Sequence, residues 1–231
     1  MDTNTLVKTG FTGNQLKLIA VITMTIDHMG MILFPRLWVL RLIGRLAMPI
    51  YAYMIAEGCR HTHDRRRYLG RIVGLGLLCQ VVYTAYLQSL YLNILLTFSL
   101  SIILICAIEN FQQKRTLGVQ IGVFALLLGI FVLTVALPEL LWRWDFDFDY
   151  GLMGVLLPVL VYFGREKTKY LAAGLILLGF RYGGLQWAAL AAVPLLGMYN
   201  GQRGKGNVGK WFYLYYPAHL LVLYGIGMAI F

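Results

Sequence analysis

VITMTIDHMGMILFP, residues 21–35, places an aspartate and a histidine side by side in a segment that is otherwise apolar enough for the interior of a membrane. A charged side chain at the centre of a membrane helix costs about 2.5–3.5 kcal/mol, whereas one leucine contributes only about 0.3–0.6 kcal/mol. Such residues usually face the interior of a helix bundle and mark a site or a path. Asp27 and His28 are therefore the first candidates for a function.

The composition of the 231 residues is that of a polytopic membrane protein. Hydrophobic residues make up 59% and charged residues 13%, the mean hydropathy is +0.70, and an ordinary soluble domain has about 25% charged residues. Apolar stretches of about 20 residues, enough to cross a bilayer as a helix, recur along the chain. We expect one all-α domain over residues 1–231, a transmembrane bundle of about nine helices at 15–34, 37–59, 70–88, 93–111, 117–138, 151–163, 168–183, 185–199 and 211–230.

The net charge of +10 indicates topology rather than a nucleic-acid partner. With the N-terminus inside, only Arg36 and Arg143 of the 20 lysines and arginines fall outside. Arg41, Arg45 and Arg181 lie within the predicted helices, and the remaining basic residues fall on the cytoplasmic side. This bias predicts a cytoplasmic N-terminus and, after nine crossings, an extracytoplasmic C-terminus.

The outer half of the bilayer is expected to hold several polar side chains. Arg41 and Arg45 share one helix face because they are spaced i, i+4; each could instead reach the outer headgroups. Adjacent helical residues do not face each other, so we expect Asp27 to orient Arg45 or Tyr150 rather than to form a dyad with His28. Asp27 could equally pair with Arg45 for structural reasons alone.

Two histidines are candidates for a general base, because a neutral imidazole can accept a proton near neutral pH. His28 lies in the first predicted helix and His219 near the middle of the last. Either could instead make a purely structural hydrogen bond, and the sequence leaves open which of them is the base.

The segment WRWDFDFDYG, residues 142–151, alternates aspartates with aromatic residues on the outer side. It is typical of an interfacial aromatic rim. Its residues Asp149 and Tyr150 could also form a substrate site together with Arg41 and Arg181. Arg45 or Arg181 could stabilise a developing oxyanion.

Basic residues concentrate in two cytoplasmic segments, EGCRHTHDRRRYLGR (57–71) and YNGQRGKGNVGK (199–210). They could serve only as positive-inside anchors. Arginine side chains and glycine-rich backbone also suit phosphate groups, and we expect no metal site because cationic neighbours repel a cation. The residues that would bind phosphates are Arg60, Arg65, Arg66, Arg67, Asn200, Arg203 and Lys205.

Several blocks resemble the TraX family in the family's order, over nearly the whole chain. They are LKLIAVITMTIDHMGMILFP, GRLAMPIYAYMIAEGCRHT, NILLTFSLS, DYGLMGVLLPVLVY, RYGGLQWAALAAVPLLGMYNGQRG and KWFYLYYPAHLLVLY. TraX proteins are named for acetylation of the pilin N-terminus in conjugative pilus biogenesis. The family is distantly similar to transmembrane acyltransferases, including the acyltransferase-3 enzymes and lysosomal heparan glucosaminide acetyltransferase, which take acetyl-CoA from the cytoplasm and acetylate an acceptor on the far side.

The resemblance implies an acetyl-CoA-dependent acetyltransferase in a bacterial inner membrane. The essential first-helix histidine of the wider group corresponds to His28, with Asp27 beside it, and the final-helix histidine is His219. The basic end of the second helix, from Arg60 to Arg65–Arg67, would receive coenzyme A. The acceptor, an amine or a hydroxyl, does not carry over from the family.

Two other functions remain open at this stage. A small-molecule transporter or flippase would use the same buried charges as a path, although the odd helix number and the lack of visible inverted repeats speak against it. An assembly role in a conjugation apparatus would leave Asp27 and His28 without a chemical task. The expected partners are acetyl-CoA, membrane lipid and an extracytoplasmic acceptor.

The predicted orientation can be tested with a reporter fused to the C-terminus. We expect an extracytoplasmic enzyme such as alkaline phosphatase to be active there and a cytoplasmic reporter to be inactive, because nine crossings that start inside must end outside. The opposite pattern would contradict the helix count.

Overall fold

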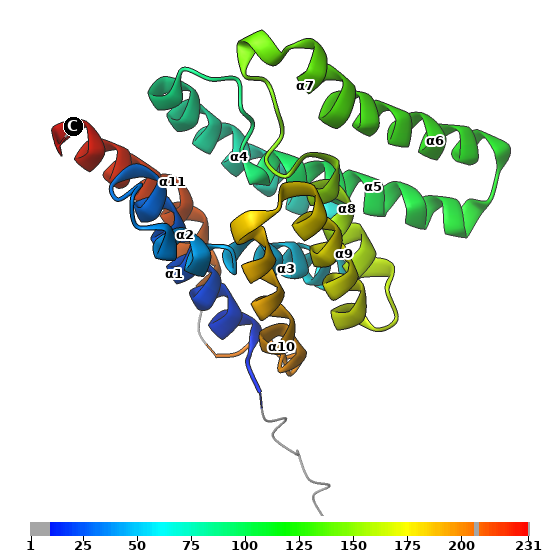
Figure 1. Ribbon diagram of the computed structural model, residues 1–231. Helices are drawn as coiled ribbons and strands as arrows, with labels where there is room; N and C mark the ends of the chain where they lie inside the picture. Colours follow the sequence, from blue (N-terminus) through cyan, green and yellow to red (C-terminus); the bar gives the residue numbers. More distant parts are fainter. Residues whose placement is uncertain (1–9, 206–207, 231) are drawn as a thin grey trace, which may run out of the picture.

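The structure, a computed structural model, describes residues 10–205 and 208–230, with the side chains of 86–87 and 208–214 left out. Over these residues it is helical and contains no β-strand, only two isolated bridges (Figure 1). The α-helices are α1 (Gly13–Ile32), α2 (Trp38–Gly44), α3 (Ala47–His61), α4 (Arg65–Leu87), α5 (Ile94–Lys114), α6 (Leu117–Phe131), α7 (Leu137–Leu140), α8 (Gly151–Phe163), α9 (Lys167–Tyr182), α10 (Ala192–Gly197) and α11 (Val208–Ile230).

These elements form nine helical segments within the described part of the chain, which confirms the predicted number. A break at Arg45 and Leu46 divides α2 from α3. A π-helical turn, Val132–Ala136, joins α6 to α7, and a 3₁₀ helix, Gly184–Ala191, leads into α10. Four segments are long and apolar enough to cross a membrane, which indicates a membrane protein: Trp38–His61, Arg65–Ala85, Ile94–Lys114 and Leu117–Leu140.

The two ends of the chain meet in the bundle, because α1 packs against α11 as well as against α2 and α3 (Figure 1). Helix α11 also packs against α4, which continues the contact to α5. Helix α8 lies between α5, α3 and α9, whereas α6 packs on α5 and leaves most of its apolar surface exposed. The site described below lies where α1, α4 and α11 meet.

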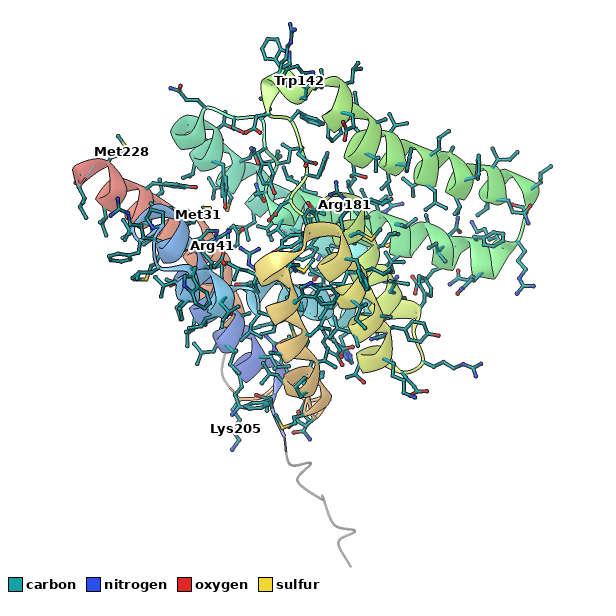
Figure 2. The ribbon with its side chains drawn as sticks, in the orientation of Figure 1. Met31, Arg41, Trp142, Arg181, Lys205 and Met228 are labelled. Atoms are coloured by element: carbon teal, nitrogen blue, oxygen red, sulfur yellow. The ribbon has the colours of Figure 1, made fainter. Side chains whose placement is uncertain are left out.

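Two groups of polar contacts between segments mark opposite ends of the bundle. At the end that we call the basic end, Asn14 binds the Lys205 carbonyl and Lys167 binds Glu57. At the other, the acidic end, Ser89 binds Asp145 and Tyr91 binds Asp149. Lys205 and Trp142 mark the two ends in Figure 2. Successive segments therefore run from one end to the other, as alternating membrane crossings require; the cytoplasmic location of the basic end stays a prediction.

Helix α8 has 13 residues, as predicted, and begins at Gly151, the last residue of the WRWDFDFDYG segment. Extended chain completes this crossing at the acidic end. The Leu92 amide donates to the Asp147 carbonyl at 2.7 Å, and the Asp149 amide donates to the Leu92 carbonyl at 2.9 Å. Irregular backbone is tolerated near lipid only where its polar groups are paired in this way.

The contact of α1 with α2 depends on a residue without a side chain. A Cβ added to Gly44 would overlap the carboxyl group of Asp27, whereas a Cβ added to Gly122 on α6 would meet open space. We therefore expect Gly44→Ala to lower the free energy of unfolding by about 1–3 kcal/mol, the usual effect of overpacking. Gly122→Ala is the matched control and should not be destabilised. Thermal unfolding in detergent measures both; equal stability of the two variants would contradict this packing.

Candidate functional site

His28 of α1 and His219 of α11 form a hydrogen-bonded pair between the two ends of the chain. His28 Nδ1 lies 2.9 Å from His219 Nε2, and both side chains are buried. His28 Nε2 lies 3.2 Å from the hydroxyl of Tyr83 on α4, and His219 Nδ1 lies 3.0 Å from the Tyr215 carbonyl. Four groups from three helices thus form one continuous chain, which brings together the two histidines that the sequence left as alternatives.

The tautomers of both rings follow from the last member of this chain. A carbonyl oxygen only accepts hydrogen bonds, so His219 Nδ1 must carry the proton that it donates to Tyr215. In a neutral ring Nε2 is then bare and accepts from His28 Nδ1–H. His28 Nε2 is bare in turn and accepts from the Tyr83 hydroxyl. An additional proton can enter only at His28 Nε2, because a proton on His219 Nε2 would face the N–H of His28.

The neighbouring Asp27 is committed to other partners. Its carboxylate makes ion pairs with Arg41 and with Arg45, the latter at 3.2 Å. Asp27 thus pairs with the two arginines and not with His28; its role in orienting Arg45 stays a prediction. Arg41, whose position is labelled in Figure 2, contacts the Asp27 carboxylate as well, so both arginines near the acidic end are neutralised in part by one aspartate.

Arg45 connects Asp27 to residues far along the chain. Its Nη1 atom donates to the Tyr150 hydroxyl at 3.0 Å and to Gln186 Oε1 at 3.4 Å. Gln186 lies in the 3₁₀ helix after Gly183 and Gly184, two glycines whose positive φ angles turn the chain there. Its amide orientation is fixed, since a guanidinium only donates. The buried Nε2 atom of Gln186 then has no acceptor among the described residues.

The other residues predicted to bind substrate do not join one cluster. Asp149 accepts a hydrogen bond from the Tyr91 hydroxyl at 2.9 Å. The Arg181 guanidinium is exposed and lies 5.3 Å from the centre of the Tyr182 ring. Tyr182 packs edge-on against Tyr150, so Arg181 is linked to the Arg45 group only through two aromatic rings.

At the basic end, two of the predicted phosphate ligands are held by carboxylates. Arg60 donates to Glu57 at 2.7 Å and to the Val161 carbonyl at 2.7 Å. Arg65 binds Glu109 and also donates to the Tyr162 hydroxyl at 3.0 Å. These contacts fasten α3 and α4 to α5 and α8, so both arginines stabilise the bundle whatever else they bind.

Arg66 is the more available cation of this region. It is exposed and makes no ion pair with any described residue, whereas Arg67 pairs with Asp64 at 3.0 Å. Arg66 lines an open cavity of about 630 Å³ between the α3–α4 turn and α5. The other lining residues are His63, Asp64, Arg65, Cys106, Glu109, Asn110 and Gln113.

The second basic segment caps the start of α1. The amides of Gly13 and Asn14 donate to the carbonyls of Gln202 and Arg203, at 2.8 and 2.9 Å. These bonds satisfy backbone groups that a helix leaves unpaired at its N-terminus. Lys205 lines a separate cavity of about 360 Å³ with Thr12, Asn14, Gln15 and Leu18, and Asn200 binds the Gly10 carbonyl. The two cavities share no lining residue.

Comparison with models of protein families identifies the family of this chain. The family model described as TraX protein matches residues 12–227. The chain belongs to the TraX family. The matched range includes the histidine pair and both basic segments.

Two relatives extend this finding. The chain is 26% identical to a probable fimbrial assembly protein FimC, serogroup H1, of Dichelobacter nodosus, over 92% of this chain and 94% of the relative. It is 33% identical to an uncharacterized protein of Rickettsia prowazekii (strain Madrid E), over 67% of this chain and 56% of the relative. No solved structure matches the chain significantly.

Sequence reasoning missed three polar residues of this TraX protein. Tyr83 and Gln186 are uncharged, so hydropathy does not single them out. Glu109 lies near the end of α5, where a charge costs less free energy than at the centre of a membrane helix. Tyr83 is one of 15 tyrosines, and nothing in its local sequence distinguishes it. Glu109 could have been identified, since an acid near the inner end of a basic membrane protein needs a cationic partner.

Proposed function

We propose that this TraX protein is a membrane-embedded acetyltransferase of the bacterial inner membrane. It moves an acetyl group from cytoplasmic acetyl-CoA to an amine or hydroxyl at the extracytoplasmic face. The observation that carries the proposal is the buried histidine pair, in which His28 Nε2 is the one ring nitrogen able to accept an additional proton. A buried proton acceptor of this kind fits general base catalysis.

The acetyl donor would enter at the basic end. Arg66 supplies an uncompensated charge beside an open cavity, and the paired Arg65 lines the same space. Phosphates of coenzyme A bind well to such side chains. Arg203 and Lys205 belong to the separate segment that caps α1, and we assign them a smaller part in donor binding.

The oxyanion that develops on the acetyl carbonyl needs hydrogen-bond donors. Arg45 and Gln186 Nε2 supply them: the guanidinium is held by Asp27 and Tyr150, and the buried amide lacks an acceptor among the described residues. Preorganised donors of this kind are typically worth about 2.7–4 kcal/mol of transition-state stabilisation.

The acceptor is proposed only by class. The name of the Dichelobacter nodosus relative refers to fimbrial assembly, so the N-terminal amine of a fimbrial or pilus subunit is one candidate. A hydroxyl of a glycan or a small molecule is chemically equivalent. We expect no metal to take part.

Inverted membrane vesicles test this function without knowledge of the acceptor. Vesicles loaded with extracytoplasmic extract expose the cytoplasmic face, so external radiolabelled acetyl-CoA should pass its label to a product inside. His28→Gln should reduce the rate by about 10²- to 10⁴-fold, the usual effect of removing a general base, while acetyl-CoA still raises the thermal midpoint of the purified variant. Arg66→Ala should weaken that binding, and Arg115→Ala, another exposed arginine at the basic end, is the matched control.

Three results would contradict the proposal. A parent protein that neither binds acetyl-CoA nor transfers label would contradict the acetyltransferase function. Activity retained by His28→Gln would exclude His28 as the base. Equal binding by Arg66→Ala and Arg115→Ala would place the phosphate site elsewhere.

A further inference from the structure

Tyr83 occupies the open end of the hydrogen-bond chain. The Tyr215 carbonyl closes the other end, and the lone pair of each imidazole is already directed at a neighbour: His219 Nε2 at His28, and His28 Nε2 at Tyr83. A molecule that approaches the pair therefore cannot reach a bare ring nitrogen. The oxygen of Tyr83 is the member of the chain that keeps lone pairs free, since it accepts no hydrogen bond from the described residues.

The position of Tyr83 suits an acceptor that comes from the acidic end. Tyr83 and His28 each lie four residues before the ends of α4 and α1 at that end, about 6 Å along each helix. Gln80, one turn earlier on α4, donates to the Tyr91 carbonyl at 2.8 Å and so fixes α4 to the loop that holds Asp149. The part of α4 that carries Tyr83 is thus fastened to this loop through Gln80 and to the histidine pair through the Tyr83 hydroxyl.

We propose that Tyr83 is the catalytic residue that contacts the acceptor and passes its proton to His28; this inference rests on the proposed acetyl transfer. The proton of the acceptor N–H or O–H moves to the Tyr83 oxygen as the Tyr83 proton moves to His28 Nε2. The acceptor electron pair forms a bond to the thioester carbonyl carbon. The C–S bond then breaks, coenzyme A leaves as a thiolate, and the proton held by His28 returns through Tyr83 to that sulfur.

His219 has a different part in this step. It accepts from His28 Nδ1–H throughout, so it stabilises the positive charge that His28 gains when Nε2 is protonated. His219 is therefore a positioning residue: it orients His28 and does not contact the acceptor. This assignment separates the roles of the two histidines, which sequence alone left interchangeable.

Tyr83→Phe tests the proposal because it removes one oxygen and keeps the ring that packs edge-on against Tyr224. Two models give opposite results. If Tyr83 carries the proton, acetyl transfer into the inverted vesicles should fall about 10²- to 10⁴-fold, while acetyl-CoA still raises the thermal midpoint of the purified variant. If Tyr83 merely covers His28, its loss exposes Nε2, and transfer should be equal or faster.

Tyr53→Phe is the matched control, because Tyr53 is an equally buried tyrosine on α3 whose ring packs against Tyr199; it should transfer acetyl groups like the parent. An active parent with an equally active or faster Tyr83→Phe variant would overturn the role of Tyr83 and leave the acetyltransferase function standing. A parent that transfers no label would overturn both.

Discussion

The hydrogen bond between His28 and His219 joins residues 191 positions apart and sets the register of the first helix against the last. Each ring nitrogen of the pair is matched by a donor or an acceptor, which matters because an unpaired polar group buried among apolar side chains costs several kcal/mol. The Tyr215 carbonyl fixes the direction of the chain through both rings to Tyr83. The packing of α1, α4 and α11 and the proposed chemistry therefore depend on the same three hydrogen bonds.

A second constraint is that charges inside a membrane bundle must be paired. Asp27 neutralises Arg41 and Arg45 near the acidic end, while Glu57 and Glu109 neutralise Arg60, Arg65 and Lys167 near the basic end. Removing one partner of such a group would leave the other charge unpaired. The free energy lost in this way is larger than the net stability that the intact pair contributes. Arg66 lacks a partner of this kind among the described residues and lines an open cavity, and that is why it is the best candidate for an anionic ligand.

Hydropathy predicted the nine helical segments and most of their ends, because burial in lipid imposes a simple condition on each stretch of about 20 residues. The cost of charge likewise identified Asp27, His28 and Arg45 as residues with a task. The sequence did not show the hydrogen-bond partners of these residues. Tyr83 and Gln186 carry no charge, and their contacts join segments 55 and 141 positions apart, so only the packing of helices shows them. The break at Arg45 divides the predicted helix 37–59 into α2 and α3. It has a cause in the sequence, because Pro49 has no N–H to donate to the carbonyl of Arg45 four residues earlier.

The most direct test of this account is the protonation of the two rings. The chain has four histidines, and the double variant His61→Gln/His63→Gln, which changes two exposed side chains, leaves only His28 and His219. Nitrogen-15 NMR of that protein, labelled at histidine in lipid nanodiscs, should show two neutral rings, both protonated at Nδ1 and bare at Nε2, with a coupling across the hydrogen bond that joins them. Rings protonated at Nε2, or two rings without mutual coupling, would contradict the directed chain and with it the assignment of His28 as the base.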